Sequence, residues 1–530
     1  MNSRLNRSGV ELAITLFVAV GLGLAMLKLG SIDAKFQIAA LLGLSGLVVI
    51  SILPARRTVC LVLWVMILPL SIEKILASTT PIWPTFIGQP ISLNAADVIL
   101  LLLTIFLAID GLFSKTQAFI WPKSANYLSL LLLWAFVSYL IHVGFYGDDF
   151  VQSTPMGLLH LLRNLIMVVI ISSAIKTRAD VIWVLIAILI TLFLQSILVY
   201  LSYSTGKLYN FSILLGQSVE AQKYTGSSGQ IVRAAGTLGV ANQQASFHAF
   251  YTILLIGFFA VKNHFFKNAA LLVILMSCLA MIMTFSRTSW IASIIASIIL
   301  FWLFLKHKEI STYGWLIGIS AAVVGVIALA IMAGPIQDRL TKGDDGATDS
   351  RVRMVALAVD LFKHNPVIGV GANEYVEAGL DLYPPGYKTT EWTAIGSKPI
   401  VPPLGRIELA TYITKGEKPI IVPLSVHNKY LLTLAELGLV GLMLWLGLYW
   451  QLLKEAWQCT KSVDQFYRYL GIAGVGCIVS TTTYMMLDLF SDDKTVQILL
   501  FTPIFVSAVG RLARLEKIQI EEAALEKSVV

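Results

Sequence analysis

The chain has 530 residues, of which 57% are hydrophobic and only 13% charged, and its mean hydropathy is +0.78. Soluble domains contain about 45–50% apolar and about 25% charged residues, so this composition excludes an ordinary soluble protein and indicates a membrane protein. The net charge is +8, but the basic residues lie in short clusters between apolar stretches, which argues against a nucleic-acid-binding protein.

Apolar stretches of about 20 residues, the length that crosses a bilayer, recur from one end of the chain to the other. They predict an all-α polytopic integral membrane protein with about 14 transmembrane helices. Arg4 and Arg7 precede the first stretch, which is long for a cleaved signal peptide and favours a retained start-transfer helix. The predicted spans are 9–29, 37–54, 58–77, 94–113, 125–144, 157–175, 180–204, 236–261, 268–285, 289–305, 312–333, 430–453, 469–487 and 495–510.

The positive-inside rule orients these spans. With Arg4 and Arg7 in the cytoplasm, each short basic loop also falls on the cytoplasmic side, whereas the short outer loop at 145–156 is acidic. Both termini are then cytoplasmic. This orientation predicts a multi-pass protein of the bacterial inner membrane, with its long loops in the periplasm.

Two outer segments, 205–235 and 334–428, are too long to be simple connectors. In the second, an apolar stripe beside basic residues predicts a helix over 351–364, ended by Asn365-Pro366, and the Pro- and Gly-rich part from 382 to 423 predicts an irregular lid. We expect N-terminal transmembrane helices (1–204), a catalytic region with both periplasmic loops (205–445), and C-terminal helices with a short cytoplasmic tail (446–530). The predicted stripe comprises Val352, Val355, Ala356, Val359, Leu361 and Phe362.

The four cysteines and seven histidines do not suggest a metal site or a disulfide framework. None of the cysteines falls in a predicted outer loop, and the histidines are scattered without ligand spacing. We therefore expect neither a metal nor an organic cofactor.

Ionisable side chains at membrane depth are costly and usually face a cavity or a partner. His160, Arg163 and Asn164 share one face of a predicted helix, where they form either a polar knot between helices or the wall of an anion site. Arg233 and a glycine turn precede the next helix, which is compatible with a phosphate cradle at a helix N-terminus or with a simple interfacial arginine. Arg287 lies in a tight outer hairpin, where it either binds an anion or extends to the headgroups.

His427 lies where the long outer loop meets a helix. An unperturbed histidine titrates near neutral pH, so this side chain is a candidate general base, although a histidine at a helix start is often incidental. Lys429 and Glu436 are two helical turns apart, share a face and are expected to pair.

Four sequence elements in this order resemble those of the O-antigen ligase and Wzy-type polysaccharide polymerase superfamily. The resemblance covers roughly residues 230 to 445, and its last two elements are the specific ones. Asn242-Gln243 stands where the family more often has Pro-Asn. The elements are R-x-x-G-T-L-G-x-x-N-Q (233–243), T-F-S-R-T-S (284–289), R-x-R-M-x-A-L-A-x-D-L-F-x-x-N-P-V-I-G-V-G-A-N-E-Y (351–375) and H-N-K-Y-L-L-T-L-A-E-L-G-L-V-G (427–441).

The resemblance implies a metal-independent, inverting glycosyltransferase that takes a glycan from undecaprenyl pyrophosphate at the periplasmic face. A polymerase passes the chain to the next lipid-linked repeat of an O-antigen or exopolysaccharide, whereas a ligase passes it to lipid A–core or a protein; the long loop before His427 favours a polymerase. Export proteins are further possible partners. The implied residues are His427 as base, Arg163, Arg233, Arg287, Arg351 and Arg353 as pyrophosphate ligands, and Asn242, Asn428, Lys429 and Glu436 in support.

Two other classes remain as alternatives. A transporter of lipid-linked oligosaccharides is expected to show inverted repeats and broken helices near the midplane, whereas the ionisable groups here gather at one outer surface. A non-catalytic scaffold for polysaccharide export would use the outer loops as docking surfaces.

Overall fold

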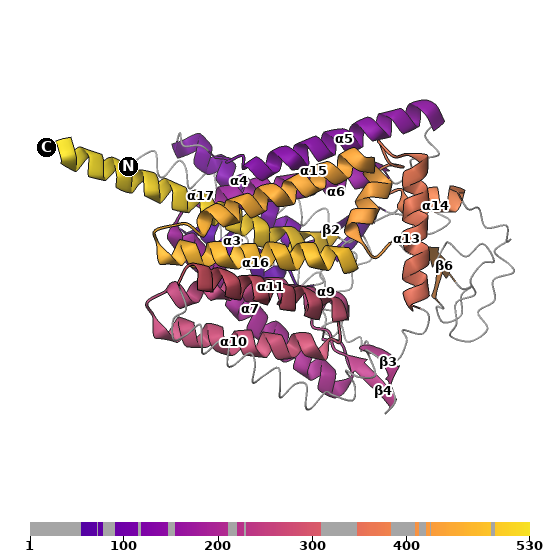
Figure 1. Ribbon diagram of the computed structural model, residues 1–530, viewed down its shortest axis with the longest axis horizontal. Coiled ribbons are helices and arrows are strands. Elements are labelled where there is room, and N and C mark those ends of the chain that lie inside the picture. Colours follow the sequence, from indigo (N-terminus) through magenta and orange to yellow (C-terminus); the bar gives the residue numbers. More distant parts are fainter. Residues whose placement is uncertain are drawn as a thin grey trace.

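The computed structural model is an elongated bundle of long helices with smaller elements at one end (Figure 1). It describes residues 53, 55–70, 73–77, 91–114, 118–146, 154–209, 220–226, 229–308, 347–382, 409–412, 420–423, 426–488 and 493–529. The predicted spans 9–29, 37–54 and 312–333 lie almost wholly outside these residues, as do most of the acidic loop at 145–156 and positions 383–408 of the predicted lid.

Nine helices in the described part of the chain are long and apolar enough to cross a membrane, and each matches a predicted span. A multi-pass membrane protein is therefore confirmed, although the expected count of 14 is not. The last helix continues without a break into the C-terminal tail. These helices are α4 (Ala95–Ser114), α5 (Lys123–Tyr146), α6 (Thr154–Ala174), α7 (Arg178–Thr205), α10 (His264–Met283), α11 (Arg287–Lys306), α15 (Lys429–Cys459), α16 (Gln465–Leu487) and α17 (Asp493–Val529).

The predicted span 58–77 is wrong as a single helix. Helix α3 covers only Arg56–Ile67, and strand β1 (Glu73–Ala77) then pairs antiparallel with β2 (Ile91–Asn94). Pro69 lies between them and has no N–H to donate to the preceding turn, which opposes continuation of α3. The Pro69 carbonyl instead accepts a hydrogen bond from the Thr237 hydroxyl at 2.6 Å.

The predicted span 236–261 is also shorter than expected. Helix α9 covers Ala241–Leu254 and passes into the 3-10 helix η2 (Leu255–Ala260). A turn precedes α9, with Gly239 in the left-handed region at φ +77°. Ahead of this turn lies a hairpin of β3 (Gln222–Gly226) and β4 (Gly229–Arg233). The sequence pattern placed the helix start before the turn because small and apolar residues continue through it.

The bundle has a simple order across its width. Helix α15 packs between α5 and α16, and α16 in turn packs on α11 and α9, which adjoin α10 (Figure 1). The smaller elements α13, α14 and β3–β6 gather at the end of the bundle where α15 begins. We call it the His427 end, after the residue that lies there.

Helix α13 (Ala347–His364) confirms the predicted helix in the second long loop, and it ends before Asn365-Pro366 as expected. Its buried face differs from the predicted stripe, because Val352 is 64% exposed. The face that packs on α14 (Tyr375–Leu382) and the start of α15 consists of Met354, Leu357, Ala358 and Leu361. Further along, β5 (Leu409–Tyr412) and β6 (Ile420–Pro423) form an antiparallel hairpin in part of the predicted irregular lid.

Two glycines allow the main chain after α13 to cross α15 at very close range. Helix α15 changes direction at Gly438 (φ +67°), and Gly369 has φ +70°. A Cβ atom on Gly438 would lie 2.1 Å from the Val367 carbonyl oxygen, and one on Gly369 would lie 2.2 Å from that of Glu436. Backbone hydrogen bonds from Gly371 N–H to the Glu436 carbonyl (2.9 Å) and from Leu439 N–H to Pro366 (2.9 Å) hold the crossing. Gly369, from the motif at 351–375, and Gly438, from the motif at 427–441, thus determine the course of α15.

Replacing Gly438 with alanine should destabilise the protein strongly. The variant meets both a left-handed backbone and a clash with backbone atoms that cannot rotate away, which together cost at least about 2 kcal/mol. We expect a lower thermal unfolding midpoint in detergent and less folded protein in the membrane. Gly144→Ala is the matched control, because nothing lies within 4 Å of a Cβ there. Equal midpoints for the two variants would contradict this account of the crossing.

Candidate functional site

The start of α15 is tied to the end of α16, and this contact positions His427. Asn428 is the N-cap of α15: its side-chain oxygen accepts the Leu431 N–H at 3.0 Å. Its amide nitrogen donates to the Met486 carbonyl of α16 at 2.9 Å. A side-chain cap fixes the first turn of a helix, so Asn428 holds the backbone of its neighbour His427 against α16.

His427 forms a dyad with a carboxylate that sequence reasoning did not single out. Its Nδ1 lies 3.0 Å from Oδ1 of Asp488, the C-cap residue of α16. The His427 side chain is 32% exposed and that of Asp488 only 6%. A carboxylate acceptor on Nδ1 favours the tautomer with the proton on that nitrogen, which leaves Nε2 as a proton acceptor. The geometry therefore suits a general base whose outer nitrogen can reach a substrate.

Tyr484 connects this dyad to the neighbouring helices. Its hydroxyl lies 3.0 Å from Oδ2 of Asp488 and 2.9 Å from the Asn242 carbonyl oxygen of α9, and it can donate to one of them at a time. It also hydrogen-bonds with Ser286 and Ser289 at the start of α11. Buried polar groups linked in this way hold one another in place.

Arg233 and Asn242, from the first motif, are in direct contact. The Arg233 guanidinium donates to Asn242 Oδ1 at 2.5 Å and to the Thr284 carbonyl oxygen at 3.3 Å. Arg233 ends strand β4, and Thr284 lies in the α10–α11 hairpin, so one side chain bridges the first two sequence motifs.

The hairpin itself places Arg287 at the first position of α11. It turns through Phe285, a non-glycine residue with φ +53°, and Ser286 is the N-cap residue. A left-handed backbone at a bulky residue costs energy and is often found at functional sites. The N-terminal end of the helix dipole of α11 adds partial positive charge beside the half-buried Arg287.

Glu436 lies on the α15 face that meets α14. Its carboxylate accepts hydrogen bonds from the backbone N–H groups of Asn373 and Tyr375, at the start of α14, and interacts electrostatically with Lys429 and His160. Lys429 also lies 5.7 Å from the centre of the Trp445 ring. Glu436 therefore links α15 to the start of α14, whereas the contacts of Lys429 lie within α15.

Arg163 belongs to a different cluster, which joins α4, α6 and α17. Its guanidinium forms a two-point ion pair with Asp97, and Gln497 donates to the same carboxylate at 3.1 Å. Arg163 therefore has a polar partner on α4 that also bonds to α17, and its role as an anion ligand stays a prediction.

Arg351 and Arg353 both lie on α13, and Met354 of its packing face lies one turn after Arg351 and directly after Arg353. Arg351 is half-buried, and the Arg353 side chain lies outside what the structure describes.

The main residues that sequence reasoning missed are Asp488 and Tyr484. Tyr484 lies at the outer end of the predicted span 469–487 and Asp488 directly follows it, on the side of the membrane where the predicted orientation places His427. A carboxylate next to such a span end was the available signal, but it lies outside the four motifs.

Comparison with known proteins supports the family resemblance. No curated protein matches the chain. The family model described as O-Antigen ligase matches residues 271–446, a stretch that contains the α10–α11 hairpin, α13 and the start of α15. Over these residues the chain is similar to the O-antigen ligase family, which confirms the predicted resemblance to the O-antigen ligase and polymerase superfamily.

Proposed function

We propose that the protein is a glycosyltransferase of the inner membrane that transfers a glycan from undecaprenyl pyrophosphate to a glycan acceptor at the periplasmic face. The observation that carries the proposal is the His427–Asp488 dyad, linked through Tyr484 to Asn242, Arg233 and the first turn of α11. A base and a positively charged site at the same end of a membrane bundle are what transfer from a lipid pyrophosphate requires. The proposed catalytic region, 205–445, is thus completed by two residues of α16.

In the proposed reaction, His427 Nε2 takes the proton of an acceptor hydroxyl as its oxygen attacks the anomeric carbon of the donor sugar. The new glycosidic bond forms while the bond from that carbon to the pyrophosphate oxygen breaks. The electron pair leaves with undecaprenyl pyrophosphate, and attack from the opposite side inverts the anomeric carbon. Asp488 stabilises the imidazolium that forms, and this proton then passes to water.

Charge on the leaving pyrophosphate must be stabilised for this reaction to proceed. Arg233 and Arg287 are the proposed ligands, because Arg287 lies in the α10–α11 hairpin and Arg233 hydrogen-bonds to Thr284 of that hairpin. A guanidinium can bind phosphate through two N–H groups. Arg351 and Arg353 of α13 are proposed as further ligands from the neighbouring element. Arg163 is a weaker proposal, because Asp97 already pairs with its guanidinium. Preorganised positive charge of this kind supplies much of the transition-state stabilisation in such sites.

Replacing Arg287 with alanine should raise the KM for the lipid-linked donor by about 10- to 100-fold, because a charge-assisted hydrogen bond contributes about 1.5–3 kcal/mol. Initial rates of the purified enzyme at varied donor concentration measure this change. Arg178→Ala is the matched control, since Arg178 is 42% exposed and forms a surface ion pair with Asp464 at the opposite end of the bundle. An unchanged donor KM in Arg287→Ala would remove this residue from the proposed site.

We favour a polysaccharide polymerase, because the long segment before His427 offers room for a glycan acceptor. A ligase is the second candidate, favoured by the description of the matching family. A strain lacking the gene separates the two when its lipid-linked and surface glycans are sized on a gel. Accumulated single repeats without long chains support the polymerase, whereas full-length chains left on the lipid carrier support the ligase. A glycan ladder identical to that of the parent strain would reject both.

A further inference from the structure

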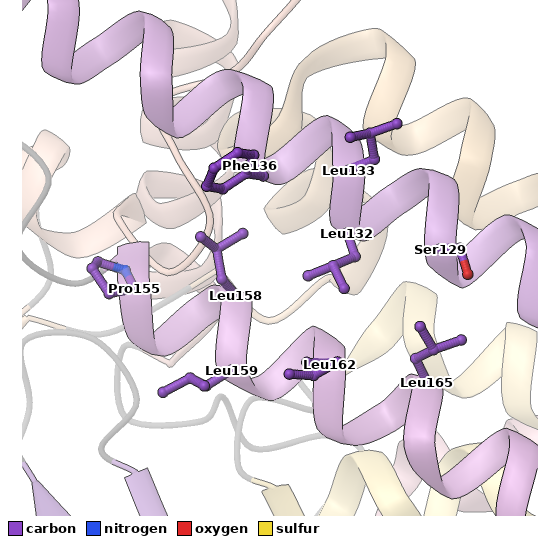
Figure 2. Close-up of a pocket in the computed structure, with 9 residues that line it drawn as sticks. All are labelled: Ser129, Leu132, Leu133, Phe136, Pro155, Leu158, Leu159, Leu162 and Leu165. Carbon is purple, nitrogen blue, oxygen red and sulfur yellow. The ribbon is translucent and has the colours of Figure 1, made fainter.

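An open apolar groove of about 630 Å³ lies between α5 and α6 (Figure 2). Leu132 and Phe136 of α5 and Leu158 of α6 extend into the gap between the two helices, and Leu133 and Leu159 lie at its outer edges. This volume is within the range of about 300–1,000 Å³ that encloses a drug-sized ligand, so it suits a segment of a single hydrocarbon chain. The groove is lined chiefly by Leu132, Leu133 and Phe136 of α5 and Leu158, Leu159 and Leu162 of α6.

The groove faces the lipid. Both helices are membrane spans, and large apolar side chains along the groove remain uncovered: Leu133 is 57% exposed and Leu159 is 48% exposed. In a bilayer these surfaces are in contact with hydrocarbon chains, so the natural occupant of the groove is a lipid tail.

The groove and the two proposed pyrophosphate arginines lie on opposite sides of the α15–α16 pair. Helix α5 packs on α15, whereas α11 and α9 pack on α16 (Figure 1). Arg287 starts α11, and Arg233 hydrogen-bonds to Asn242 of α9. His427 precedes α15 and Asp488 ends α16, so the dyad lies at the end of the pair that separates the two sides. A donor held by Arg233 and Arg287 would therefore lie across the α15–α16 pair from a lipid tail in the groove.

The end of the groove near Pro155 lies against the segment between α13 and α14, which is hydrogen-bonded to α15. The Thr154 hydroxyl, one residue before Pro155, donates to the buried Glu374 carboxylate at 2.9 Å, and Gly157 packs directly against Ala372. His160 lies on the same helix and interacts with Glu436 of α15. A lipid in the groove would thus carry its headgroup to the His427 end of the bundle.

We propose that the α5–α6 groove binds the polyprenyl chain of a lipid-linked glycan acceptor and so presents the acceptor hydroxyl to His427 from the side opposite the donor. This inference rests on the proposed function, and it identifies the acceptor as a polyprenyl-linked glycan. One groove of this volume between two helices fits a single chain better than the several chains of lipid A.

Photo-crosslinking tests occupancy of the groove without requiring activity. The full-length protein carries p-benzoylphenylalanine in place of Leu159 in phospholipid nanodiscs, with radiolabelled undecaprenyl phosphate as the probe. Leu194 of α7 is the control position, because it is also 48% exposed but lies outside the groove. We expect at least fivefold more capture at 159 than at 194, suppressed by excess unlabelled undecaprenyl phosphate. Equal capture at the two positions, or suppression by lipid A instead, would overturn the proposal.

Steady-state kinetics tests whether the groove serves the acceptor. Leu159→Trp fills the groove from an exposed position, so it should raise the KM for a polyprenyl-linked acceptor at least tenfold while the donor KM stays within twofold. Leu194→Trp should change neither value. A rise in donor KM would assign the groove to the donor and overturn the inference. If the wild-type protein transfers no glycan, the proposed function fails, and the crosslinking result still decides whether the groove binds a polyprenyl chain.

Discussion

Replacing His427 with alanine should lower the rate of glycan transfer by about 100- to 10,000-fold, the usual contribution of a general base. The loss should appear in kcat, because the imidazole acts on the acceptor hydroxyl during the chemical step, whereas donor binding is assigned to arginines on other elements. The side chain is 32% exposed, so its removal leaves no buried cavity. Transfer by purified wild type and variant in nanodiscs, at saturating donor and acceptor, measures the effect.

His264→Ala is the control for His427→Ala. His264 is an exposed histidine at the first position of α10, at the other end of that helix from the α10–α11 hairpin. Its replacement should leave transfer within twofold of wild type. Both variants should insert into the membrane in normal amounts. Turnover at the wild-type level by His427→Ala would sink the assignment of this residue as the base.

The helical part of the fold could be predicted from the sequence because apolar length is a strong signal. Nine spans appear where the hydropathy pattern places them, and α13 ends at Asn365-Pro366 as expected. The pattern failed where a local backbone feature overrides hydrophobicity. Pro69 ends α3 early, and the turn at Gly239 delays the start of α9.

The candidate site was predicted only in part, because motifs identify residues without showing which ones meet. The sequence named Arg233 and Asn242 as separate members of one motif, and the structure adds that they hydrogen-bond to each other. It could not reveal that Tyr484 bridges α9, α11 and α16, since contacts between distant segments depend on helix packing. Similarly, the sequence did not show that Arg163 pairs with Asp97, which lies 66 residues away along the chain.

Replacing Asp488 with asparagine should lower kcat by about 100-fold or more and leave the KM for the donor nearly unchanged. The carboxylate accepts the Nδ1 proton of His427, so it orients the ring and stabilises the imidazolium that forms during transfer. An amide has no charge, and it can turn its own N–H groups toward Nδ1, which favours the tautomer with Nε2 protonated. Such a ring can no longer accept the acceptor proton.

Two further variants separate this positioning role from a structural one. Asp464→Asn makes the same substitution at the opposite end of the same helix, where asparagine caps a helix about as well as aspartate, and it should retain activity. Asp488→Glu restores the charge with a longer side chain and should recover part of the kcat lost in Asp488→Asn. If the glutamate variant were no more active than the asparagine variant while both were as stable as wild type, charge at this position would be irrelevant. Asp488 would then serve only to hold α16 against Tyr484, and His427 would have to act without a carboxylate partner.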